Sequence, residues 1–237
     1  MRYSKRNQQV VDKSNFKEVP ARRGSSDSLT LSKLVAGTAS GYPLPRDDFG
    51  QYNCLKYQIL SGGVNHIDSG HHFRWHKGEY TLGKLLSTLF NKYRVEREEL
   101  FITSKQGFLD LNYKEKADKN LVIQELISST SLEETDFVKD TGYCMKPQFL
   151  NYSLQNSLQR LNLQTLDCAI LQDPFEATFG GVTPEMASLS ATVRYRKYLE
   201  RLAKAFEFYE DAVSRGLIRS YGISSVESMI TEQSVGL

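Results

Sequence analysis

Short apolar runs alternate with longer segments of helical periodicity from about residue 34 onward, and this alternation constrains the fold more than any other feature. The runs are four to six residues long and indicate strands, whereas the segments between them place apolar side chains three and four residues apart, as helices do. Strands that alternate with helices are typical of a parallel sheet or barrel, because each helix returns the chain to the same end of the sheet. We therefore predict an α/β fold with about five βα units and strands at residues 34–37, 64–68, 100–103, 167–172 and 220–224.

Amphipathic helices are predicted between these strands. The clearest begins at Glu79 and places leucines on one face, namely Leu82, Leu85, Leu86 and Leu89. Pro147 is a good residue for a first turn and opens another helix. The remaining helices are predicted over 52–59, over the segment that ends at Gly216, and over a short segment from about Val226.

Two stretches interrupt the alternation and one precedes it. Residues 1–29 form a basic N-terminal arm, and residues 30–237 form a partial barrel with inserts at 107–147 and 175–190. The first insert carries one short helical candidate at 121–127. Long inserts of this kind usually lie at one end of a barrel, where loops gather.

Composition limits the class of protein. Thirty Lys and Arg residues against 28 Asp and Glu residues leave a net charge of +2, which is too small for a nucleic-acid field over the whole surface. No window approaches the roughly 18 consecutive apolar residues of a spanning helix, so we predict no membrane insertion. Cys54, Cys144 and Cys168 are odd in number and far apart, which favours reduced thiols and an intracellular compartment.

The arm concentrates positive charge and has no apolar segment typical of a secretory signal. Its basic residues are Arg2, Lys5, Arg6, Lys13, Lys17, Arg22 and Arg23, against Asp12 and Glu18. We interpret it first as a solvated or partner-bound arm. The alternatives are a mitochondrial import signal and an anchor on RNA or on an acidic protein surface, so the compartment stays open between mitochondrion and cytoplasm.

Four ordered motifs within residues 30–230 resemble the aldo-keto reductase superfamily. The first is Gly63–Gly70 followed by Glu79–Lys84, and the second is Arg97–Lys105. The third is Phe149–Pro174, and the fourth is Gly216–Ser224. The resemblance implies a (β/α)₈ barrel of the TIM type, with its chemistry at the carboxyl ends of the strands.

The resemblance also implies a reaction in which NADPH reduces a carbonyl with the help of four side chains. Asp68 and Lys105 stand at the aspartate and lysine positions of that set. Phe73 stands where a proton-donating tyrosine is expected, and Gln172 stands where a histidine is expected. Phenylalanine has no proton to give, whereas glutamine can still donate a hydrogen bond. Ser224 and Ser225 are weak matches to cofactor-binding positions.

Histidines near Phe73 offer two further hypotheses. His71, His72 or His76 could replace the missing proton donor, although a shift of one residue changes the direction of a side chain in a loop. His72 and His76 also have the spacing of a zinc pair, with Glu79 as the nearest carboxylate and no cysteine nearby. We favour loop histidines that bind no metal.

The sequence ends about one helix after the fifth predicted strand, where the resemblance implies three further strands and most of the cofactor contacts. We therefore expect an incomplete barrel that binds no cofactor by itself. Five strands would leave an open sheet with exposed edges, so we expect other protein subunits to cover the open side after the fifth strand.

Two hypotheses follow. The first is a catalytically inactive aldo-keto reductase-like protein, a pseudoenzyme that acts as a structural or interaction subunit of a larger assembly. The alternative is an NADP(H)-dependent oxidoreductase that reduces a carbonyl substrate and is completed by another chain or by a further C-terminal segment.

Overall fold

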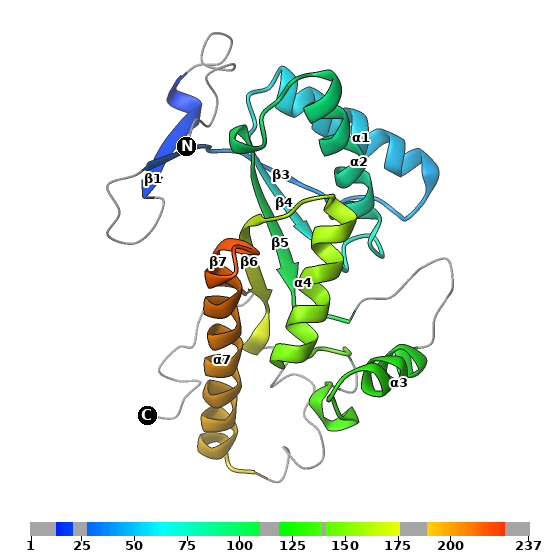
Figure 1. The fold of residues 1–237 in the computed structure, drawn as a ribbon, viewed down its shortest axis with the longest axis vertical. Coiled ribbons are helices and arrows are strands. Elements are labelled where there is room, and N and C mark those ends of the chain that lie inside the picture. Colours follow the sequence, from blue (N-terminus) through cyan, green and yellow to red (C-terminus); the bar gives the residue numbers. More distant parts are fainter. Residues whose placement is uncertain (1–12, 21–27, 110–118, 139–140, 176–188, 226–237) are drawn as a thin grey trace. The chain divides into compact units, whose positions relative to one another are not determined.

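A five-stranded sheet organises the chain in the computed structural model, which describes residues 13–20, 28–109, 119–138, 141–175 and 189–225 (Figure 1). The strands lie in chain order, and β3 pairs with β4 and β4 with β5 in parallel. This arrangement confirms the predicted α/β fold with a parallel sheet of five strands. The strands are β3 (Val35–Gly37), β4 (His66–Gly70), β5 (Phe101–Gln106), β6 (Leu166–Gln172) and β7 (Ile218–Ser224).

Five α-helices lie in the described part of the chain. They are α1 (Pro45–Leu60), α2 (Lys77–Lys92), α3 (Lys119–Ser129), α4 (Pro147–Leu161) and α7 (Ala191–Ser214), together with the short 3₁₀ turns Lys13–Asn15, Arg97–Glu99 and Glu134–Asp136. None of the described helices is long and apolar enough to cross a membrane.

Several predicted boundaries were wrong by a few residues. Helix α1 begins at Pro45, before the face of Tyr52, Leu55 and Ile59 that indicated it, because proline suits the first turn and Asp47 and Asp48 favour the positive end of the helix dipole. Strand β4 begins at His66 rather than Val64, and β7 begins at Ile218 rather than Ser220. The short helix predicted from Val226 lies outside the described residues.

An antiparallel hairpin was not predicted. It joins β1 (Phe16–Pro20) to β2 (Ser28–Ser32), so it begins inside the segment interpreted as an arm. The Asn65 side chain fastens β2 to the sheet, because its Oδ1 accepts from Ser32 N at 2.7 Å and its Nδ2 donates to Thr30 O at 2.8 Å. Most of the predicted basic arm lies outside the described residues.

The chain divides into two compact units. Residues 1–105 and 156–168 form the first, and residues 106–155 and 169–237 form the second. The four leucines predicted on one face of α2 are fully buried in the first unit. In the second unit the buried side chains include Phe149, Leu150, Leu154, Ala205 and Tyr209.

Candidate functional site

Asp68 and Lys105 form an ion pair at the carboxyl ends of β4 and β5 in the first unit. Asp68 lies opposite Thr103 in the strand register, and Lys105 follows Thr103 by two residues. Alternate residues of a strand point to the same face, so the carboxylate and the ammonium meet on one face of the sheet. The side chains keep 28% and 15% of their surface exposed, so solvent reaches both groups.

Phe73 lies beside this ion pair. The centroid of its ring is 5.1 Å from Lys105 Nζ, within the range of a cation–π contact. Two backbone bonds hold the residue in its turn: Phe73 N donates to Gly70 O at 2.9 Å, and Gly78 N donates to Phe73 O at 3.1 Å. A carbon–hydrogen ring therefore contacts the ammonium where the resemblance implies a phenol.

The loop after β4 has an unusual backbone that sequence reasoning missed. Arg74, Trp75 and His76 all have positive φ angles, 53°, 51° and 68°. Such angles are uncommon in residues other than glycine, and three in succession require support from the surroundings. No glycine marks these positions, so no local signal in the sequence could have indicated them.

Arg74 supplies that support. Its side chain is fully buried and donates to Asp48 Oδ1 at 2.5 Å, to Gln51 Oε1 at 2.6 Å and to Tyr42 O at 2.9 Å. The partners belong to α1 and to the residues before it, so the arginine ties the loop to another element. This contact fixes the loop that carries Phe73.

The neighbouring histidines are engaged with the backbone and with other rings. His71 Nδ1 lies 3.1 Å from Lys105 O, and His76 Nδ1 lies 2.8 Å from His71 O. Burial lowers the pKa of His72 to about 3, and its ring meets the Phe73 ring edge-on at 4.8 Å between centroids. His72 is therefore neutral at physiological pH.

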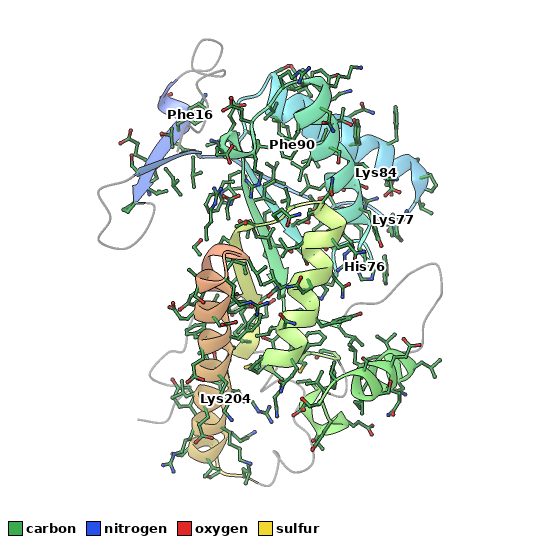
Figure 2. All side chains as sticks on the ribbon, viewed as in Figure 1. Phe16, His76, Lys77, Lys84, Phe90 and Lys204 are labelled. Atoms are coloured by element: carbon green, nitrogen blue, oxygen red, sulfur yellow. The ribbon has the colours of Figure 1, made fainter. Side chains whose placement is uncertain are left out.

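Glu79 is not available for the zinc hypothesis. Its carboxylate is fully buried, accepts from Ser104 Oγ at 2.7 Å and from Arg160 Nε at 2.8 Å, and so forms a structural ion pair. Across the described ranges, no group of three or more His, Cys, Asp or Glu side chains is arranged to hold a metal ion. Figure 2 shows His76 directly before α2, with Lys77 beginning the helix.

Gln172 and Ser224 belong to the second unit and are described separately from the ion pair. Gln172 Nε2 donates to Asp173 Oδ2 at 3.2 Å, and Asp173 N donates to Ser224 O at 2.7 Å, so the ends of β6 and β7 are joined. Gln172 Oε1 and Ser224 Oγ are buried and have no hydrogen-bond partner among the described residues. Ser225 is exposed.

A carboxylate only accepts, so Asp173 fixes which end of the Gln172 amide faces it. The amide oxygen of Gln172 is therefore the end of the side chain that stays available to a ligand. The Ser224 hydroxyl is available in the same way. A buried acceptor and a buried hydroxyl without partners among the described residues fit a ligand group that both donates and accepts, such as a primary amide. The roles of these residues stay predictions.

The sequence model of the Aldo/keto reductase family matches residues 34–234. The chain belongs to this family. Its match covers most of the sequence, including all five strands of the sheet.

A known protein shows how similar this chain is in sequence to a characterised relative. The chain is 26% identical over 205 residues to the NADP-dependent D-sorbitol-6-phosphate dehydrogenase of Malus domestica, and the matched region covers 81% of this chain and 52% of the relative. The chain thus spans about half the length of the curated relative it matches.

Solved structures share the fold. The holo form of an aldo-keto reductase from Bacillus halodurans gives a TM-score of 0.53 at 17% identity, covering 89% of this chain and 51% of that one. An aldo-keto reductase of the silkworm Bombyx mori gives 0.53 at 20% identity, covering 88% and 48%. The same reductase complexed with NADPH gives 0.55 at 20% identity, covering 88% and 47%. At these identities the likeness concerns the fold.

Proposed function

We propose that this aldo-keto reductase family member is catalytically silent in carbonyl reduction and acts as an interaction subunit of a larger assembly. The observation that carries the proposal is the Phe73 ring beside Lys105 Nζ. A positioned general acid contributes about 10²-fold to 10⁴-fold to a rate, and a phenyl ring cannot serve as one. Gln172 further replaces the histidine expected to orient the carbonyl.

Adding a hydroxyl group to the ring at position 73, by the substitution Phe73→Tyr, tests the proposal. We expect the wild-type chain to oxidise NADPH with an activated aldehyde such as 4-nitrobenzaldehyde no faster than the background reaction, and Phe73→Tyr to exceed that rate only where NADPH also stabilises the chain against heat. Phe90→Tyr, which adds a phenol on α2 instead, is the control (Figure 2). Wild-type turnover that Lys105→Met abolishes would overturn the proposal.

The interaction role draws support from the two ends of the sheet. Strands β3 and β7 are the end strands, and they leave Val35 48% and Ile223 43% exposed. Unpaired strand edges with apolar side chains are ready-made surfaces for another chain. We propose protein partners at the β7 end and, for the basic arm, an acidic protein or RNA surface. Light scattering of the native protein checks this, since a stable free monomer contradicts it.

A second candidate function is an NADP(H)-dependent oxidoreductase. The Asp68–Lys105 ion pair favours it, as does the NADP-dependence named for the Malus domestica relative. When bound, NADPH supplies a hydride to a carbonyl carbon. Ser224 and Ser225 would hold the cofactor's amide. The Lys105 ammonium would stabilise developing negative charge on a substrate oxygen.

A further inference from the structure

Helix α7 carries its charges against the direction that the helix dipole favours. Residues 191–204 hold five basic side chains and one acidic one, Glu200, whereas residues 205–214 hold three acidic side chains and no basic one. A cation in the first turn of a helix, as Arg194 is here, is unfavourable by a few tenths of a kcal/mol to about 1 kcal/mol, and the dipole has little effect further along. Helix stability alone therefore does not account for the pattern. The basic residues are Arg194, Arg196, Lys197, Arg201 and Lys204.

Four of these five residues lie on one side of the helix. Arg194, Lys197, Arg201 and Lys204 are spaced by three, four and three residues, which aligns them along the axis. We call this set the basic stripe. At a rise of 1.5 Å per residue it extends over about 15 Å. Arg196 lies on a different side of the helix.

The basic stripe has no acidic neighbour within hydrogen-bonding reach among the residues that the structure describes. None of its side chains forms an ion pair with a described residue, in contrast to Arg74, Arg97 and Arg160 elsewhere in the chain. Lys197 and Lys204 are exposed, and Arg194 Nε is buried and has no hydrogen-bond partner in the described part of the chain. A buried charged donor without a partner costs free energy, so a ligand that accepts from it gains affinity.

The neighbours of α7 place this half of the helix near the carboxyl end of β6 in the second unit. The Tyr198 ring meets Phe175 edge-on at 5.5 Å between centroids, and Phe175 follows β6 by three residues. Burial of the Cys144 thiol raises its pKa to about 12. The positive charge of Arg201, a residue of the stripe, acts on the same thiol and lowers its pKa, but more weakly than burial raises it. Lys204, labelled in Figure 2, marks the C-terminal limit of the stripe.

We propose that the basic stripe of α7 binds an acidic segment of a partner protein. The inference rests on the proposed role as an interaction subunit and names the chemistry of the partner. A single phosphate could not contact cations spread over about 15 Å, whereas carboxylates repeated every three or four residues of a helix match their spacing. Val193 lies four residues before Lys197 and is 38% exposed, which adds an apolar contact at one end.

A protein partner fits this surface better than single-stranded RNA. Proteins that bind single strands generally stack bases on exposed aromatic side chains. Tyr198 is buried and packs against Tyr195 and Phe175, so its ring provides no open stacking surface. The stripe offers charge and an aliphatic side chain instead.

Binding of fluorescein-labelled poly-L-glutamate tests the proposal by fluorescence anisotropy at low salt. The double variant Lys197→Glu with Lys204→Glu should weaken binding about tenfold, because both charges are reversed. The matched control, Lys84→Glu with Arg196→Glu, changes the net charge equally but leaves the stripe intact, and it should stay within about twofold of wild type. Thermal melts of both variants verify that they fold.

Two results would overturn the proposal. Equal losses in the stripe variant and the control would show attraction to net charge alone. Tighter binding of poly-uridylate than of poly-glutamate, with the same loss in the stripe variant, would assign the stripe to RNA. Because Phe73→Tyr kinetics do not involve α7, failure here is distinguishable from failure of the proposed catalytic silence.

Discussion

Phe73 differs from the tyrosine implied at its position by one hydroxyl group, and its surroundings suit the ring that is present. The Lys105 ammonium lies over the aromatic face, an interaction worth about 0.5–2 kcal/mol depending on how far it is desolvated. Asp68 balances the charge of the same ammonium. The chain therefore retains the Asp68–Lys105 ion pair but lacks the phenol hydroxyl that would donate a proton. For this reason Phe73→Tyr is the informative substitution.

His72 should make the stability of the protein depend on pH. Its pKa in the folded chain is about 3, chiefly because of burial, against 6.5 for an unperturbed histidine. The unfolded chain therefore binds a proton more readily, so the stabilisation is complete above pH 6.5 and is lost as the pH falls toward 3. The unfolding free energy should fall by up to about 1.4 kcal/mol per pH unit in that window.

His72→Gln removes the titrating group and should flatten this part of the profile. Denaturant midpoints measured between pH 4 and pH 7 for both proteins give the comparison. Parallel profiles for wild type and variant would mean that His72 does not titrate between the folded and unfolded states as described.

Among the elements, α2 approaches the last turn of α4 so closely that a glycine is required. A Cβ atom built on Gly83 would lie 2.1 Å from the carbonyl oxygen of Arg160, which is backbone and cannot move aside. The Glu79–Arg160 ion pair lies one turn earlier on α2 and joins the same two helices. The resemblance placed Gly83 within a motif, but only the packing gives the reason for it.

Gly83→Ala should destabilise the protein by about 1–3 kcal/mol, because the added methyl group forces the two helices apart. Gly50→Ala is the matched control, since a Cβ at Gly50 of α1 meets no atom within 4 Å. That control should leave stability unchanged or raise it by up to about 1 kcal/mol through higher helix propensity. Urea unfolding of the three proteins measures both effects. Equal stability of the two variants would contradict the close approach.

For the whole molecule, sheet order repeats chain order, so each βα unit adds one neighbouring strand. This regularity explains why the fold could be predicted: strand and helix periods are local properties of the sequence. The family match over residues 34–234 agrees with this fold, and the chain spans about half the length of its curated relative.

Cofactor binding by this chain can be measured as stabilisation. A ligand at 100 times its dissociation constant raises the unfolding free energy by about 2.7 kcal/mol. If the chain is catalytically silent, we expect the thermal midpoint to be the same with millimolar NADPH as with an equal concentration of ATP. A larger shift with NADPH, reduced in Ser224→Ala, would favour the oxidoreductase candidate instead.

The sequence by itself determined the order and type of the main elements, because their periodicity arises from residues close together in the chain. The family resemblance placed Asp68 and Lys105 in one set of site residues, and the structure brings the two together as an ion pair. Only the tertiary structure decided the β1–β2 hairpin, the left-handed loop held by Arg74 and the lack of ion-pair partners for the basic stripe within the described ranges. These features depend on contacts between distant residues, such as Arg74 with Asp48, which no local pattern encodes.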